Sequence, residues 1–332
     1  MDVGLGPGRA VSVVPGPSVA MLSEKELVDY TGYREDFLEW LLHVGKNPDR
    51  AQGYSEYTVY ETAYRSAAFD RWTWDEHGEY TVPPRPDDAD GYLQKIAYED
   101  TAQATKGKIE EMLHRYWRWL HREHGVDEWT PDYSFSSSGG NSGPRDFLTI
   151  EERELLWTRA LRYQDDWKVT SLVWTSLDAG LRPVEVSRAK THWVDVDNSL
   201  LRIPKEDAAK NENNWRVSLR DRTARALGRW LKERGDRSDY NETDALWLTE
   251  RGNTYGSKSL KRLLETLCEQ AGITTETRQL SWYAIRHSVG TYMTREAGLA
   301  AAQSQLRHLN SQTTMKYDQT PADDRRDALN RM

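Results

Sequence analysis

Cysteine is nearly absent from this chain of 332 residues, in which Cys268 stands alone. A single cysteine excludes an internal disulfide and any zinc site built on several cysteines. Cys268 lies within a helical pattern of apolar residues, which predicts a plain core position. Because the chain cannot be a disulfide-stabilised secreted domain, we expect it in the cytoplasm.

Long apolar segments and cofactor motifs are missing as well. No run of 18 apolar residues is present, so the sequence predicts no membrane-spanning helix. Residues 1–20 are rich in glycine, proline and valine and lack the pattern of a signal peptide, so we expect a disordered tail. There is no Gly-x-x-x-x-Gly-Lys loop and no His, Asp or Glu cluster with metal-ligand spacing, so we expect neither a cofactor nor a metal.

An overall positive charge, the usual mark of a DNA-binding protein, is missing too, because the formal net charge is −8. The distribution is more informative: residues 1–100 carry 9 basic and 19 acidic side chains, whereas residues 182–234 carry 13 basic and 8 acidic ones. Arginine outnumbers lysine 32 to 13. With the acidic N-terminal surface, this bias is common in proteins adapted to high internal salt; ordinary variation in surface charge is the alternative.

The first 130 residues show helical periodicity. Apolar and aromatic residues recur at helical spacing in 21–45, 54–74, 89–97 and 101–124, which predicts a small all-helical domain over 21–131. Basic residues punctuate the last segment, and the candidates for DNA contact there are Lys106, Lys108 and Arg115. One face of this helix would then rest on a phosphate backbone, although a solvated face over an aromatic core explains the same pattern.

A segment rich in serine and glycine, 134–144, predicts a flexible linker over 132–147. A second domain follows over 148–332, and its helices are expected at about 149–163, 166–179, 221–234, 257–271 and 282–297, with short pieces near 300 and 313. Runs at 193–196, 200–204 and 215–219, separated by turns, predict a three-stranded antiparallel sheet. The expected fold is mainly α with a small antiparallel β-sheet (α+β), in two domains.

Five residues of the second domain suit the cleavage of a DNA phosphodiester: Arg182, Lys210, Arg286, His308 and Tyr317. Such cleavage without water needs a nucleophile in line, cations beside the non-bridging oxygens and an acid for the departing 5′-oxygen. A tyrosine phenol forms an ester that a DNA hydroxyl can later attack, so ATP is not needed. Arginine is always charged and binds phosphate through two donors, and a lysine on a hairpin tip can supply the proton.

The order of these residues resembles the tyrosine recombinase (phage integrase) family, over about 150–320 for the catalytic domain and more loosely over 21–130 for the core-binding domain. The matching motifs are Gly180-Leu181-Arg182 with Glu185, Lys210 seven residues before Val217, Arg286-His287-Ser288, Leu306-Arg307-His308, and Tyr317 nine residues after His308 and preceded by Thr313-Thr314. The composition is similar to that of members from halophilic archaea or their viruses and plasmids.

The chain departs from the family pattern at three positions. The family usually has histidine where Tyr283 stands, three residues before Arg286. With an ordinary pKa near ~10, a phenol there would donate a hydrogen bond to the phosphate rather than shuttle a proton. Arg307 replaces the glycine that usually precedes the histidine, and we expect it to add a phosphate contact. Ser218 replaces a proline after the hairpin.

The resemblance implies a site-specific DNA recombinase or integrase that clamps double-stranded DNA between two domains and works through a 3′-phosphotyrosine intermediate. Its catalytic residues would be Arg182, Lys210, Tyr283, Arg286, His308 and the nucleophile Tyr317. Strand exchange by this chemistry implies a homo-tetramer on DNA. Two alternatives stay open: a type IB topoisomerase-like enzyme that relaxes DNA, and a catalytically weakened integrase-fold protein that only binds DNA.

Overall fold

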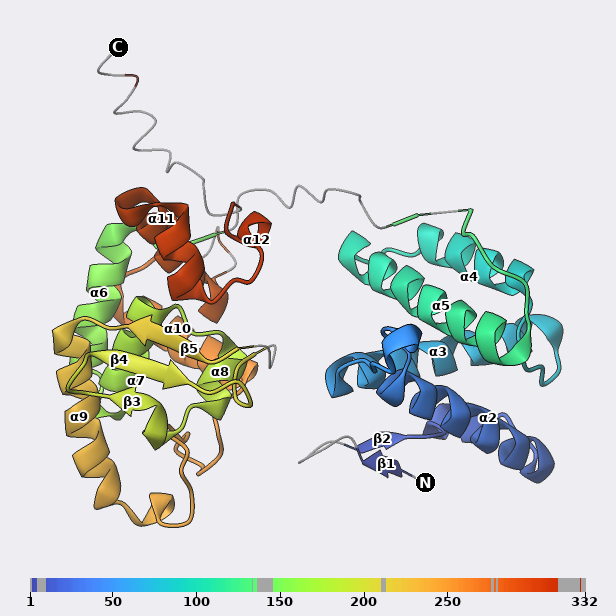
Figure 1. The fold of residues 1–332 in the computed structure, drawn as a ribbon, viewed down its shortest axis with the longest axis horizontal. Helices are drawn as coiled ribbons and strands as arrows, with labels where there is room; N and C mark the ends of the chain where they lie inside the picture. Colours follow the sequence, from blue (N-terminus) through green and yellow to red (C-terminus); the bar gives the residue numbers. More distant parts are fainter. Residues whose placement is uncertain are drawn as a thin grey trace. The chain divides into compact units, whose positions relative to one another are not determined.

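The computed structural model describes residues 2–4, 10–132, 134–135, 146–209, 213–275, 278, 280–315 and 329. The chain divides into two compact units, Met1–Asn141 and Ser142–Met332, which we call the N-terminal and C-terminal units (Figure 1). The dividing point falls inside the segment 132–147 that the sequence predicts as a linker. Within the described ranges, no helix combines the length and the apolar character needed to cross a membrane.

The N-terminal unit is built on four long helices: α2 (Glu24–His43), α3 (Glu56–His77), α4 (Pro86–Tyr98) and α5 (Gln103–His124), with a 3₁₀ turn, η1, at Pro48–Arg50. Ser23 caps α2 through its hydroxyl and Glu26 caps it in return, so the start of this helix follows directly from local sequence. Helix α5 contacts α2, α3 and α4 and contributes Tyr116 and Trp119 to an aromatic core. The predicted all-helical character of this region is therefore confirmed.

Within the first 20 residues, the described segments 2–4 and 10–20 are ordered, unlike the disordered tail that the composition predicts. Strand β1 (Asp2–Gly4) pairs antiparallel with β2 (Ala10–Ser12), and a short helix, α1 (Gly16–Val19), follows. Val11 and Val13 are fully buried in the same core as Phe37, and Nε of Arg34 donates to the carbonyl of Val13 at 3.2 Å. Two alternating valines thus supply enough apolar surface to hold the segment on the unit.

The C-terminal unit is organised around helix α7 (Trp167–Ala179), whose residues from Lys168 onward are all buried. It contacts α6 (Ile150–Leu161), α9 (Asp221–Gly235) and α11 (Trp282–Leu306). The remaining helical elements are α8 (Pro183–Arg188), α10 (Ser257–Ala271), α12 (Ser311–Met315) and the 3₁₀ turns η2 (Thr191–Trp193) and η3 (Ser238–Tyr240). Cys268 is buried in the core of this unit, as predicted.

Three short strands form the predicted antiparallel sheet, in the order β3 (Val194–Asp195), β4 (Leu200–Ile203) and β5 (Trp215–Ser218). Leu201 and Val217 are register partners and are fully buried, whereas their neighbours along the strands are more exposed. This alternation puts one face of the sheet against the core, where β5 contacts α7 and β3 contacts α9 (Figure 1). The predicted fold class, mainly α with a small antiparallel sheet, is confirmed.

Helix α11 joins the predicted helix at 282–297 to the predicted short piece near 300. Gly298 has φ 83° and ψ 170°, so two helical pieces meet at a kink that glycine tolerates. The second piece buries Ala302 and Leu306 and ends where Arg307 adopts a left-handed conformation with φ 58°. The kink therefore brings 306–308 back onto the core beside the first turns of the same helix.

Candidate active site

Arg182 lies at the N-cap of α8, directly after the core helix α7 has ended at Gly180. Gly180 has φ +56°, and a Cβ there would come 2.7 Å from a methyl of Leu306, so both backbone and packing require glycine. The Arg182 N–H donates to Oε2 of Glu185 at 2.8 Å, and its Nη1 donates to Oε1 at 2.9 Å. Among the described residues the guanidinium has no other partner, so Nε and Nη2 keep donors for a ligand.

Arg286 lies in the first turns of α11 and is 2% exposed. Its Nη1 donates to the carbonyl of Gly180 at 2.6 Å, and its Nη2 donates to the carbonyl of Leu306. The same Nη2 lies 2.9 Å from Nε2 of His308. Arg286 is thereby hydrogen-bonded both to the turn that precedes Arg182 and to the segment that contains His308.

His308 is 6% exposed and is held at both ring nitrogens. Nε2 faces Arg286, and Nδ1 lies 2.9 Å from Oγ1 of Thr314. Because arginine is only a donor, Nε2 must accept, and a neutral ring then carries its hydrogen on Nδ1 and donates to Thr314. Thr314 is buried on α12, so that short helix sets the orientation of the ring.

Arg182 and His308 open onto one cavity of about 170 Å³. Its walls come from Arg182, Glu185, Ala209, Trp215, Arg307, His308, Leu309, Asn310 and Thr313. Positive guanidinium donors and a buried histidine around a small, partly enclosed space suit a phosphate group. The structure thus brings three of the six catalytic candidates into one cluster: Arg286 contacts His308 and bonds the Gly180 carbonyl, two residues before Arg182, and Arg182 and His308 line the same cavity.

Arg307 is not available for the phosphate contact that the sequence predicts. Its side chain is 4% exposed, and all five of its N–H donors are used inside the protein. Nε and Nη2 donate to the two carboxylate oxygens of Glu185, and the remaining contacts go to the carbonyls of Ala179, Gly180 and Gln305. No donor of this arginine is left for DNA.

Of the other three catalytic candidates, only Tyr283 lies among the described residues. Tyr283 is 43% exposed on α11, one turn before Arg286, and its ring lies 6.2 Å from that of His287. No hydrogen bond joins its hydroxyl to any described residue, so the structure does not bring it into the cluster. Lys210 and Tyr317 lie outside the described residues.

The three basic candidates for DNA contact on α5 differ in whether their side chains are available. Lys106 is 8% exposed, and its Nζ donates to the carbonyl of Ala97 at 2.8 Å, so the expected contact with a phosphate backbone is corrected to a structural role. Arg115 pairs with Glu111 at 3.0 Å, and its guanidinium lies over the ring of Tyr54. Lys108 is exposed and stays a candidate for DNA contact.

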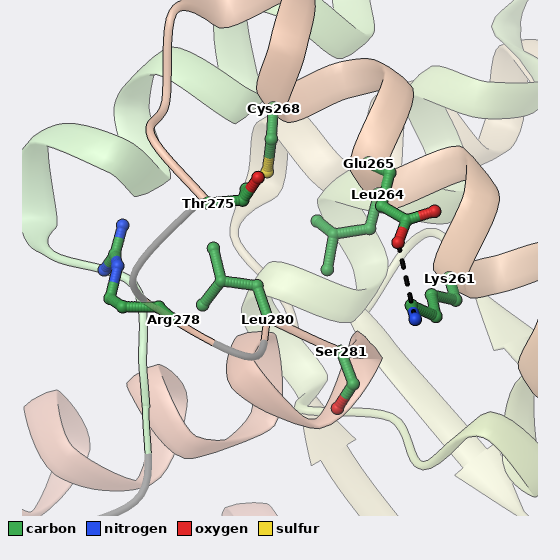
Figure 2. A pocket seen from close by; sticks show the side chains of 8 residues that line it. All are labelled: Lys261, Leu264, Glu265, Cys268, Thr275, Arg278, Leu280 and Ser281. Carbon is green, nitrogen blue, oxygen red and sulfur yellow. Dashed lines mark ion pairs between the residues drawn. The ribbon is translucent and has the colours of Figure 1, made fainter.

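A second cavity of about 630 Å³ in the C-terminal unit holds none of the predicted catalytic residues. Figure 2 shows its lining, which is Lys261, Leu264, Glu265, Cys268, Thr275, Arg278, Leu280 and Ser281. Burial raises the pKa of the Cys268 thiol to about 11, so the thiol stays protonated and is a poor nucleophile. Lys261 pairs with Glu265, and Arg278 pairs with Glu152, so the basic groups here are already neutralised.

In the described parts of the chain, no group of three or more His, Cys, Asp or Glu side chains could hold a metal.

Sequence reasoning missed two residues that build the site. Thr314 enters the sequence motif only as half of a Thr-Thr pair, yet its hydroxyl orients His308. Gln305 donates to the carbonyls of Asp178 and Ser218 and accepts from the Ser218 N–H, so it joins α11 to the end of strand β5. No sequence signal points to Gln305, because its partner residues, Ser218 and Asp178, lie 87 and 127 residues away along the chain.

A mainly helical chain with a small antiparallel sheet, in which two arginines and a histidine lie beside one cavity, is consistent with the class of tyrosine recombinases. The model of the phage integrase family matches residues 147–323, more than half of the chain, and the protein belongs to that family. The sequence-based predictions of family and of a site-specific DNA recombinase as enzyme class are therefore confirmed.

Tyrosine recombinase XerD of Bifidobacterium longum (strain NCC 2705) is 25% identical over 294 residues, covering 84% of this chain and 90% of the relative. The fold is similar to that of XerH site-specific recombinase bound to palindromic difH substrate in a post-cleavage complex, with TM-score 0.64, 15% identity, and 92% and 88% of the two chains covered. The Tn1549 transposon integrase in complex with transposon right end DNA gives TM-score 0.62 at 15% identity, covering 87% of this chain and 98% of the other.

Proposed function

We propose that this protein cuts and rejoins double-stranded DNA at specific sites through a covalent 3′-phosphotyrosyl intermediate on Tyr317. The observation that carries the proposal is the contact of Arg286 with His308 and with the Gly180 turn that leads to Arg182, together with the small cavity that Arg182 and His308 line. Preorganised donors of this kind stabilise the charge that builds on a phosphorane more than the charge of the ground state. The family membership of 147–323 supports the same chemistry.

In the first step, Tyr317 Oη gives its phenolic proton to solvent and attacks the scissile phosphorus, and the bond from phosphorus to the 5′-oxygen breaks. Arg182 and Arg286 hold the non-bridging oxygens, and His308 supports Arg286 in that role through the 2.9 Å contact. Lys210 gives the departing 5′-oxygen its proton, and the Tyr283 hydroxyl donates a hydrogen bond to the phosphate. In the second step, the 5′-hydroxyl of another duplex gives its proton to the neutral Lys210 amine and attacks the phosphotyrosine. The bond from phosphorus to Tyr317 Oη breaks and the phenolate takes a proton from solvent, so the number of phosphodiester bonds is conserved.

We further propose that a homo-tetramer assembles on two DNA sites, because exchange by this chemistry involves four strand cleavages. The double-stranded DNA substrate implies action in the cytoplasm. The excess of acidic side chains in 1–100 and of arginine over lysine supports an origin in a halophilic archaeon or its mobile elements. Sedimentation of the protein with and without its DNA site tests the tetramer, and unfolding measured across potassium chloride concentrations tests the salt adaptation.

The central test identifies the target sequence in the course of the experiment. Wild type and Tyr317→Phe are incubated with fragmented DNA from around the gene, denatured, and freed of all DNA that is not covalently bound. Wild type is expected to retain fragments whose sequenced ends define the cleavage site, without added metal or ATP, and Tyr317→Phe none. The recovered site then provides a nicked duplex for single-turnover kinetics, in which Arg182→Ala should cleave about 10²- to 10³-fold more slowly.

The same assay separates the two alternatives. A topoisomerase-like enzyme would relax supercoiled plasmid and form adducts, yet would not join two different duplexes that carry the recovered site. A protein that only binds DNA would bind equally well as wild type and as Tyr317→Phe and would form no adduct in either case. That second result would contradict the proposal.

A further inference from the structure

Each carboxylate oxygen of Glu185 accepts two hydrogen bonds, one from Arg182 and one from Arg307. Oε1 accepts from Nη1 of Arg182 at 2.9 Å and from Nε of Arg307 at 3.1 Å. Oε2 accepts from the backbone N–H of Arg182 at 2.8 Å and from Nη2 of Arg307 at 2.6 Å. Because one carboxylate serves both residues, the position of the Arg182 guanidinium depends on what Arg307 does.

The carboxylate is 1% exposed and yet ionised. Burial by itself would raise the pKa of Glu185, but the guanidinium of Arg307 opposes this, followed by that of Arg182, and the pKa is lowered to about 2. A buried charge of this kind has to be satisfied by bonded partners, because water cannot reach it. Arg307 presents a bidentate fork to it, which is the strongest form of such a pair.

Arg307 holds its side chain against Glu185 at a cost in backbone conformation. Its backbone has φ 58°, a left-handed geometry that favours glycine and costs an L-residue about 1 kcal/mol. Its donors all end on Glu185 or on three carbonyls around the Gly180 turn, one of which, that of Gly180, also accepts from Arg286. A side chain held in this way links the carboxylate to the turn that carries Arg182.

We propose that Arg307 is a positioning residue that satisfies Glu185 and so leaves the outer donors of Arg182 for the scissile phosphate. Without Arg307, the buried carboxylate would keep Arg182 as its bonded side-chain partner, and a bidentate pair would turn Nη2 of Arg182 away from the cavity. The inference rests on the proposed phosphate-binding role of Arg182. It gives the Arg307 departure from the family pattern a function without any contact to DNA.

The test is a double-mutant cycle in the full-length protein on the nicked site recovered with wild type. Arg307→Met should lower the single-turnover cleavage rate about 100-fold, the effect of losing one well-placed donor. DNA affinity, measured in the Tyr317→Phe background, should change by less than about 3-fold, because the backbone contacts that dominate affinity lie elsewhere. Adding Glu185→Gln should restore cleavage about 10-fold over Arg307→Met alone, because a neutral side chain no longer draws Arg182 inward.

Two further variants keep the result interpretable. Arg307→Gly removes the side chain while relieving the left-handed backbone, and it should cleave as slowly as Arg307→Met. Arg307→Lys keeps the charge but not the fork, and it should fall between wild type and Arg307→Met, which also covers the case that the methionine variant fails to fold.

A purely structural role would lower the melting temperature and DNA affinity together with cleavage and would show no rescue by Glu185→Gln. That pattern, or an Arg307→Met variant that cleaves like wild type, would overturn the inference while leaving the proposed function intact. If wild type itself formed no adduct, the proposed function would fail, and the phosphate role of Arg182 would fail with it.

Discussion

Nη2 of Arg286 and Nε2 of His308 lie 2.9 Å apart, although 22 residues separate the two in the chain. Arginine can only donate in this contact, so the histidine accepts, and its remaining ring hydrogen is committed to Thr314. The arginine also bonds the Gly180 carbonyl, beside Arg182. Two catalytic candidates thus hold each other in place before any substrate arrives, which reduces the reorganisation needed during the reaction.

Thr314→Val should slow DNA cleavage about 10-fold, because it removes the acceptor of the His308 Nδ1 hydrogen while keeping the shape of the side chain. The measurement is the single-turnover rate on the nicked site, together with ¹⁵N spectra of the imidazole, which should show the hydrogen on Nδ1 in wild type. Thr314→Ser keeps the hydroxyl and should stay close to wild type. A valine variant with unchanged rate would show that this contact does not orient the ring.

Tyr283→Phe should lower the cleavage rate about 10-fold if the phenol bonds the scissile phosphate, since a hydrogen bond to a charged group is worth about 1.5–3 kcal/mol. The hydroxyl is exposed and has no partner among the described residues, so folding stability should not change. Tyr283→His introduces the residue usual in the family and serves as the matched variant, which should cleave at least as fast as wild type. Equal rates for phenylalanine and wild type would remove Tyr283 from the catalytic set.

Gln305→Leu should destabilise the C-terminal unit by about 2–3 kcal/mol, because it leaves two carbonyls and the Ser218 N–H without their partner. It should also slow cleavage, since strand β5 begins at Trp215, shortly after Lys210 in the chain. Chemical denaturation and single-turnover kinetics measure the two effects. Ser218→Pro removes one of the three bonds, so its effect should be clearly smaller. A proline variant as unstable as the leucine variant would contradict this assignment.

The N-terminal unit should become more stable as the pH falls from about 6 to about 4. Asp70 is 1% exposed and accepts from the hydroxyls of Tyr30 and Tyr116 at 2.6 and 2.9 Å. Burial raises its pKa to about 6, against the opposing effect of Arg34. The native state therefore binds the proton more tightly than the unfolded chain, whose carboxyl titrates near ~4. Ionisation costs on the order of 3 kcal/mol above pH 6, and this cost disappears on protonation.

Hydrogen exchange of the α3 amides between pH 4 and 7, corrected for intrinsic rates, measures this dependence. Asp70→Asn should flatten it, because no proton is then exchanged at this position. Asp75→Asn, on the exposed side of the same helix, provides the control and should keep the wild-type profile. A profile that stays steep in Asp70→Asn would assign the pH dependence to another group.

Local sequence signals were sufficient for most of the fold. The helix at 257–271 has the bounds that periodicity predicts, and the three predicted strands pair antiparallel in chain order. Local signals failed at Val11 and Val13, where a composition typical of a tail hides two residues that find a core some 25 residues away. They succeeded around Gly298, where the predicted helix 282–297 and the predicted short piece near 300 meet at a kink.

The site was predicted in its residue types but not in every role. Arg182, Arg286 and His308 stand in an order that resembles the family pattern, and the structure places His308 against Arg286 and both near the turn that leads to Arg182. Arg307 was expected to face the phosphate, because its position next to His308 places it near the site. Whether an arginine faces a ligand or a buried carboxylate depends on partners distant in sequence, and Glu185 lies 122 residues away.

The sequence by itself indicated the type of reaction, the cleavage and rejoining of DNA, because the order of a phenol, two guanidinium groups and an imidazole can be read without a structure. It also determined the helices and the sheet, whose signals are periodic and local. Only the tertiary structure decided which arginine is turned toward the cavity and which is turned inward. Hydrogen-bond donors are directional and are satisfied by whatever acceptor packing brings within about 3 Å, and packing is a property of the whole chain.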